Sequence, residues 1–161
     1  MERLSLCKVN SDYLRQLHEL DERVSSKYDK RPFVGIIVMV NEIGYVIPLT
    51  SQTTQEREKR GKTKRSTRIT TFIKDDRGKE ISNMLYNNMV PVPEGMYEYI
   101  KVDPSKDSYY MHEIRFIRKN SDKIINKARK VHDDRMTKHD PFLEKTCCDF
   151  RLLENKYLDF K

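Results

Sequence analysis

The sequence predicts a single α+β domain with an antiparallel sheet. Its 161 residues suit one domain, and 37% hydrophobic with 35% charged residues is a globular composition. Over residues 1–102, short apolar runs alternate with turn residues, which is typical of strands. From Tyr110 the apolar residues repeat every three or four positions, which is typical of helices. Strands followed by helices favour an α+β domain, and with no repeat visible we expect residues 1–161 to form one unit.

The N-terminal part predicts strands and one helix. The continuous apolar run over 33–40 suits a buried strand, and residues 41–44 have the composition of a hairpin turn. Asn10 or Ser11 can cap a helix with leucines on one face. The elements expected here are a strand over 5–9, a helix from the cap to Val24, a loop over 25–31, a strand over 33–40 and a returning strand over 45–49.

The remainder predicts a loop, further strands and then helices. Residues 50–67 carry no apolar side chain, so we expect a long exposed loop, and loops of this length are usually functional or disordered. An apolar stripe from Tyr110 to Val131 predicts one helix, or two helices broken near Asn120. The other elements expected are strands over 68–74, 81–86, 89–92 and 97–102, a turn over 75–78, a loop over 138–145 and a last helix capped by Asp149.

The positive charge is concentrated in one segment. The net charge is +7, and residues 57–68 contain seven Lys/Arg against one acidic residue. Such a cluster attracts phosphate backbones, although a solvated loop that maintains solubility would have the same composition. The cations are Arg57, Lys59, Arg60, Lys62, Lys64, Arg65 and Arg68, and a further basic face, with Arg115 and Lys119, lies on the predicted helix.

Several classes of function have no support in the sequence. No apolar run approaches the roughly 20 residues that span a bilayer, and we expect a cytoplasmic protein without membrane contact. Cys7, Cys147 and Cys148 have no zinc-site spacing and are expected to be buried or idle thiols. P-loop, GxGxxG, HExxH and GxSxG motifs are absent, and Asp75-Asp76 suits a turn better than a metal site. We therefore expect neither a metal nor a cofactor.

Two polar stretches could carry chemistry. Thr50 and Ser51 stand where a buried strand meets the basic segment, and hydroxyls beside cations can bind a phosphate and stabilise charge that develops on it. Tyr28, Lys30 and Arg31 offer an aromatic face for a base and cations for phosphates. Either stretch alone could equally be the start of an ordinary loop.

Five motifs occur in an order that points to one family. They are RPFVGI (31–36), PLTS (48–51), NNMVPVP (87–93), FIRKNSDKI (116–124) and CCDFRLLENKY (147–157). Together they resemble the toxins of type III toxin–antitoxin systems, the ToxN/AbiQ/CptN group, over about Tyr13 to Phe160. The resemblance implies a compact α+β domain built on a strongly bent antiparallel sheet. It also implies a metal-independent endoribonuclease that often cuts at adenine-rich sites.

The resemblance implies partners and site residues as well. The inhibitor would be a small repeated RNA that folds into pseudoknots, which the toxin cuts from a precursor and keeps in a closed assembly. Messenger RNA would be the substrate, and the role would be growth arrest, in some members with abortion of phage infection. Thr50 and Ser51 match the family's hydroxyl pair, and Tyr28 and Arg31 match an aromatic and a basic position. Tyr13 matches a tyrosine of the first helix and is expected to bind RNA.

The sequence departs from the family after Ser51. Many relatives have a lysine within a few residues of the Leu-Thr-Ser motif, whereas here the first cation is Arg57. Arg57 or Lys59 could take the role of that lysine if the segment folds back. The sequence does not choose between them.

The resulting hypothesis uses the nucleophile that RNA itself carries. In-line attack by the 2′-oxygen would leave a 2′,3′-cyclic phosphate and a 5′-hydroxyl, with positioning and electrostatics supplying most of the acceleration. Thr50 and Ser51 would hold the phosphate or the 2′-hydroxyl, Arg31 and a loop cation would stabilise the charge, and Tyr28 would stack on or orient a nucleotide. No general base is evident.

Three alternatives remain open from the sequence. The first is a non-catalytic RNA-binding protein that uses the basic segment and the basic face of the predicted helix. The second is a DNA-binding regulator with the basic helix in a major groove, although simple amphipathicity is the favoured explanation of that face. The third is Ser51 as an acyl nucleophile, for which no histidine lies nearby in the sequence.

Overall fold

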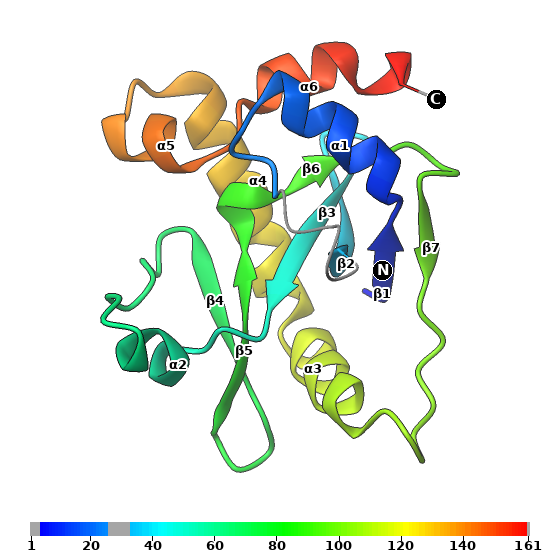
Figure 1. Ribbon diagram of the computed structural model, residues 1–161, viewed down its shortest axis with the longest axis vertical. Helices are drawn as coiled ribbons and strands as arrows, with labels where there is room; N and C mark the ends of the chain where they lie inside the picture. The colour runs from blue at the N-terminus through cyan, green and yellow to red at the C-terminus, as the bar shows by residue number, and fades with distance from the viewer. Residues whose placement is uncertain (1–3, 26–32, 161) are drawn as a thin grey trace.

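The computed structural model describes residues 4–25 and 33–160 and contains one antiparallel sheet with helices packed around it (Figure 1). The strands are β1 (Leu6–Val9), β2 (Phe33–Val40), β3 (Ile43–Thr50), β4 (Thr70–Lys74), β5 (Glu80–Leu85), β6 (Val90–Pro91) and β7 (Tyr97–Tyr99). The helices are α1 (Ser11–Leu20), α2 (Thr54–Lys59), α3 (Ser108–Lys119), α4 (Ser121–Thr137), α5 (Pro141–Thr146) and α6 (Phe150–Lys156).

The sheet is divided into two halves that share β3. Six of its seven strands run in the order β4-β5-β3-β2-β1-β7, and the seventh, β6, pairs with β3 beside this path. Ile43 to Pro48 of β3 pair with β2, whereas Leu49 and Thr50 pair with β5. All of these pairings are antiparallel, which confirms the predicted α+β class. The change of partner carries the end of β3 out of the core toward α2 (Figure 1).

Packing of the helices explains the apolar stripe in the C-terminal part of the sequence. Ile124, Ala128 and Val131 of α4 are buried, and α4 packs against β2 behind the sheet in the view of Figure 1. The stripe forms two helices, α3 and α4, which meet at Asn120. Asn120 caps the end of α3, and both its backbone N–H and its side-chain amide donate to the Phe116 carbonyl. The C-terminal α6 lies beside α1. Its predicted cap is confirmed, because the Asp149 carboxylate accepts the Leu152 N–H at 3.1 Å.

The β2–β3 hairpin depends on backbone geometry at two places. Asn41 and Glu42 both have positive φ, 50° and 69°, which is the two-residue turn that matches the twist of a hairpin. In β2, a Cβ on Gly35 would stand 2.3 Å from the Ile47 carbonyl oxygen of β3. Only glycine allows the two strands this close approach.

Two predicted loops contain helices. In the 50–67 segment, Thr53 caps α2 by accepting the Glu56 N–H at 3.3 Å, and Gly61 at φ +71° follows the helix end. In the 138–145 segment, Asp140 caps α5 by accepting the N–H groups of Phe142 and Leu143. Both predictions were wrong because caps, rather than apolar periodicity, define such short exposed helices.

The first helix is shorter than predicted. It begins with the Asn10 cap but ends at Leu20, because the Asp21 carboxylate turns the chain by accepting the Arg23 N–H at 3.0 Å. Val24 is buried outside the helix. The predicted thiols Cys7, Cys147 and Cys148 are free and buried, as expected.

Candidate active site

The predicted hydroxyl pair lies at the end of β3. Thr50 is the last residue of the strand and pairs with Asn83 of β5. Its Oγ1 accepts the Gln52 N–H at 3.2 Å, a short turn that brings Ser51 out of the sheet. Ser51 is exposed. The strand therefore holds Thr50 rigidly and presents Ser51 to solvent, as binding groups on a rigid scaffold often are.

A buried amide beneath this turn organises a polar network. Asn83 is fully buried, and its Nδ2 donates to Glu80 Oε2 at 2.7 Å. The same Glu80 oxygen accepts the N–H of Thr54 at 2.6 Å and its hydroxyl at 3.1 Å, which attaches the start of α2 to β5. Burial raises the pKa of Glu80, but these hydrogen bonds outweigh it and hold the pKa below its usual value. The network thus contains a stable carboxylate.

Arg65 reaches into this network from the segment that follows α2. Its Nε donates to Asn83 Oδ1 at 3.1 Å, and its Nη2 donates to Gln52 Oε1 at 3.4 Å. Burial and the nearby charge of Arg57 lower the pKa of Arg65, while Glu80 raises it by less. The basic segment therefore folds back onto two residues beside Thr50, and it does so through Arg65, whereas Arg57 contacts Thr63 and Lys59 lies near Glu56.

The other cations of the basic segment divide by exposure. Arg57 is half-buried and donates from Nε to the Thr63 carbonyl at 2.9 Å, which closes the loop after α2. Lys64 lies over the Phe72 ring, 5.0 Å from its centroid, and Lys59 lies 3.9 Å from Glu56. The exposed members are Lys59, Arg60, Lys62, Lys64 and Arg68. Arg57 and Arg65 are thus half-buried, while the other five cations of the segment are exposed.

Other predicted site residues lie elsewhere. Tyr13 is fully buried, and its hydroxyl donates to the Pro91 carbonyl at 2.5 Å, so we correct its prediction as an RNA-binding residue to a core role. Arg115 and Lys119 are exposed on α3, where Arg115 pairs with Asp76 at 2.6 Å. The structure does not describe Tyr28, Lys30 and Arg31, so their predicted roles stay predictions.

Sequence reasoning missed Gln52, Asn83 and Glu80. Asn83 lies in a predicted strand, and no motif marks it. The capping pattern Thr53-x-x-Glu56 was available and would have indicated α2, and with it a fold-back of the basic segment. The contact of Arg65 with Asn83 depends on strand pairing between distant segments, for which a single sequence carries no signal.

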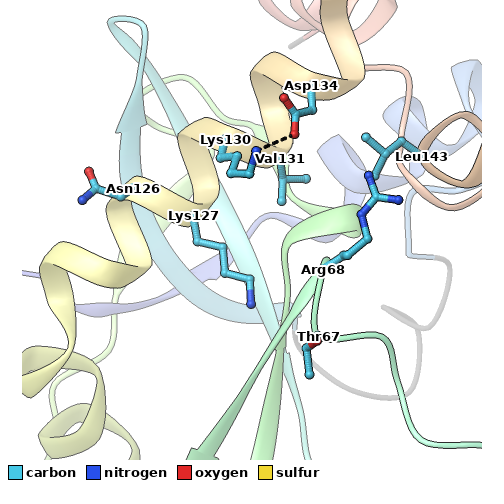
Figure 2. Close-up of a pocket in the computed structure, with 8 residues that line it drawn as sticks. All are labelled: Thr67, Arg68, Asn126, Lys127, Lys130, Val131, Asp134 and Leu143. Carbon is cyan, nitrogen blue, oxygen red and sulfur yellow. Dashed lines mark hydrogen bonds and ion pairs between the residues drawn. The ribbon is translucent and has the colours of Figure 1, made fainter. Parts of the chain in front are cut away.

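A separate pocket of about 340 Å³ lies between the start of β4 and α4 (Figure 2). Its three cations already have partners in the protein. Arg68 pairs with Asp140 at 2.7 Å, Lys130 pairs with Asp134 at 3.1 Å, and Lys127 donates to the Thr70 carbonyl at 2.8 Å. The lining residues are Thr67, Arg68, Asn126, Lys127, Lys130, Val131, Asp134 and Leu143, and the hydroxyl pair is not among them.

Acyl chemistry at Ser51 has no support in this geometry. Across residues 4–25 and 33–160, no hydrogen bond joins a histidine to Ser51, and His132 is instead buried against Glu154 at 2.6 Å. The same residues include no group of three or more His, Cys, Asp or Glu side chains placed to hold a metal ion. None of the helices found in them is long and apolar enough to cross a membrane.

Comparison with known proteins gives a consistent result. A family model described as toxin ToxN, type III toxin–antitoxin system, matches residues 5–158. The chain is 30% identical to endoribonuclease ToxN of Bacillus thuringiensis subsp. kurstaki, covering 95% of this chain and 82% of the relative. It is 29% identical to endoribonuclease AbiQ of Lactococcus lactis subsp. lactis, covering 92% and 84%.

Solved structures agree with the sequence comparison. A type III toxin studied for its selective inhibition by a non-coding RNA pseudoknot superposes with a TM-score of 0.83 at 27% identity, covering 98% of both chains. AbiQ, a lactococcal anti-phage endoribonuclease, also gives 0.83, at 25% identity, covering 98% of this chain and 97% of that one. The resemblance inferred from five motifs is confirmed, and with it the expected enzyme class. The chain belongs to the ToxN family of toxins of type III toxin–antitoxin systems.

Proposed function

We propose that this toxin is a metal-independent endoribonuclease that cleaves messenger RNA in the cytoplasm. The observation that carries the proposal is the exposed Ser51 beside a rigidly held Thr50, at the edge of a strongly cationic segment. Hydroxyls can orient a phosphate, and the surrounding cations attract the RNA backbone. The names of the ToxN and AbiQ relatives support the same activity.

The proposed reaction is in-line attack by the RNA 2′-oxygen on the adjacent phosphorus. A bond from the 2′-oxygen to phosphorus forms while the bond to the 5′-oxygen breaks, which leaves a 2′,3′-cyclic phosphate and a 5′-hydroxyl. Thr50 and Ser51 hold the phosphate or the 2′-hydroxyl in line, and fixed dipoles and charges then stabilise the transition state. In this proposal Arg31 adds positive charge and Tyr28 stacks on or orients a nucleotide.

The proposed inhibitor is a small repeated RNA that folds into pseudoknots. A solved relative is known for inhibition by a non-coding RNA pseudoknot, and this supports the same kind of antitoxin here. We propose that the toxin cuts the repeats from a precursor and holds them in a closed protein–RNA assembly. Growth arrest, and abortion of phage infection, would follow when the RNA antitoxin is lost.

Replacing one hydroxyl tests the proposal. Ser51→Ala should lower the cleavage rate by roughly 100-fold or more, because a group that acts only in the transition state is lost. Binding of an uncleavable RNA should be preserved. The matched control is Ser66→Ala, which removes a partly exposed hydroxyl from the basic segment. If Ser51→Ala cut RNA as fast as the parent protein, Ser51 would have no part in the reaction.

The competing function is RNA binding without catalysis, which the cationic surface alone would support. Comparing RNA with its deoxy analogue separates the two, using protein freed of bound RNA. Cleavage of the RNA, with no cleavage of its deoxy analogue, supports a ribonuclease. Salt-sensitive binding without any product supports the binding protein.

A further inference from the structure

Among the described residues, Arg65 is a half-buried cation with no acidic side chain paired to it. In the described part of the chain, no carboxylate lies within ion-pair distance of its guanidinium, which instead donates to the amide oxygens of Gln52 and Asn83. Taking a charge out of water without a counter-ion is unfavourable. Burial and Arg57 together lower the pKa of Arg65, which is the expected sign for such an environment. An anion that binds from solvent would offset the unfavourable burial of this positive charge.

The two amides that hold Arg65 are both neighbours of Thr50. The N–H of Gln52 donates to Thr50 Oγ1 at 3.2 Å, while its side-chain oxygen accepts from Arg65 at 3.4 Å. Asn83 is the residue opposite Thr50 across the β3–β5 pair and accepts from Arg65 at 3.1 Å. The guanidinium is therefore anchored on both sides of the Thr50 turn.

The network sets the direction of the Asn83 amide. Its Nδ2 is committed to Glu80 at 2.7 Å, so its oxygen faces Arg65. Glu80 is held in turn by the backbone and hydroxyl of Thr54. The nearest acid of the network is thus engaged elsewhere, and Arg65 keeps its positive charge available.

From this arrangement we infer that Arg65 is a catalytic residue, whose guanidinium binds the scissile phosphate beside Thr50 and Ser51. The inference rests on the proposed ribonuclease function. As the 2′-oxygen bonds to phosphorus and the bond to the 5′-oxygen breaks, the 2′-hydroxyl gives its proton to water and the leaving 5′-oxygen takes one proton from water. Arg65 keeps its own protons and stabilises the negative charge on the non-bridging oxygens. Gln52, Asn83 and Glu80 are positioning residues.

Single-turnover cleavage of a short RNA by Arg65→Ala tests the inference. The expected loss is about 100-fold or more in rate, with affinity for the same RNA carrying a 2′-deoxy nucleotide at the cut site changed by less than about tenfold. Free guanidinium, but not ammonium, should restore part of the rate. Arg77→Ala is the control, since Arg77 is an exposed arginine in the turn between β4 and β5, outside the basic segment, and it should stay within about threefold of the parent.

A second variant tests the charge without removing the side chain. Gln52→Glu places a carboxylate where the amide oxygen now lies 3.4 Å from Arg65 Nη2. The new ion pair should lower the cleavage rate by about tenfold or more while leaving the melting temperature unchanged or raised. Gln55→Glu, on an exposed position of α2, is the control and should have little effect.

The outcomes separate the two proposals. If the parent protein cuts no RNA, the ribonuclease function fails, and this inference fails with it. If the parent cuts and both Arg65→Ala and Gln52→Glu retain its rate, the ribonuclease stands and the role of Arg65 is overturned. If Arg65→Ala is unstable, the rate of Gln52→Glu decides, with loss supporting the inference and retention contradicting it.

Discussion

Glu113 illustrates how a single buried acid couples the fold to pH. It lies on the inner face of α3 at 1% exposure, and its Oε2 accepts the Ser82 hydroxyl at 2.7 Å. Burial raises the pKa of Glu113 to about 7, against a smaller opposing effect of the Ser82 hydrogen bond. The folded protein therefore holds this proton more tightly than the unfolded chain does. Its contribution to stability is full at low pH and is lost as the pH rises toward 7.

Glu113→Gln should remove that dependence. In the parent protein, the free energy of unfolding relative to the variant should fall by roughly 3 kcal/mol between about pH 4.5 and about pH 7, since one pKa unit is about 1.4 kcal/mol. Urea denaturation at a series of pH values measures it. Glu19→Gln, at an exposed position of α1, is the control. If the free energy of unfolding changed with pH in the same way for the parent and for Glu113→Gln, the raised pKa of Glu113 would be contradicted.

At the scale of elements, the β2–β3 hairpin is the part that positions the hydroxyl pair. Thr50 is the last residue of β3, so its place is set by the register between Gly35 and Pro48 and between Thr50 and Asn83. The register in turn depends on the turn at Asn41 and Glu42 and on the close approach at Gly35. A disturbance in the hairpin should therefore reach the site.

Gly35→Ala should destabilise the protein by about 1–3 kcal/mol, because the new Cβ would meet the Ile47 carbonyl at 2.3 Å and the backbone must move. Gly44→Ala in the same hairpin is the matched control. There a Cβ would lie 3.4 Å from the nearest atom, the Val92 carbonyl oxygen, so the loss should be smaller. Thermal unfolding compares the two, and equal melting temperatures would exclude the proposed clash.

Local patterns predicted the long elements but not the short ones. The strand over 33–40 is a continuous apolar run, α3 and α4 share a long apolar stripe, and the structure confirms these elements. α2 and α5 carry few apolar residues and are defined by Thr53 and Asp140 at their caps. Their prediction as loops was wrong for that reason.

The candidate site was predictable only where it is local. Thr50 and Ser51 could be located from the junction of an apolar strand with a cationic segment. The approach of Arg65 to Asn83 could not, because it depends on strand pairing between β3 and β5. Tyr13 shows the opposite error, in which a resemblance assigned RNA binding to a side chain that the fold buries.

For the whole molecule, the proposed site of the reaction follows from charge and fold together. The chain carries a net charge of +7, and its most basic segment surrounds the end of β3 instead of extending away from the fold. In the proposed mechanism, the exposed cations attract RNA over a range set by salt, while the half-buried Arg65 acts on a phosphate that is already bound. The proposal thus gives capture and catalysis to different members of one segment.

The most direct test of this account is cleavage of an adenine-rich RNA by the purified protein in EDTA, with the product ends mapped. The account predicts discrete cuts that carry 2′,3′-cyclic phosphate and 5′-hydroxyl ends. It also predicts that one 2′-deoxy nucleotide at a cut site abolishes that cut alone, because the nucleophile is removed. Cleavage that persists at the deoxy site, or that stops when EDTA is added, would contradict it.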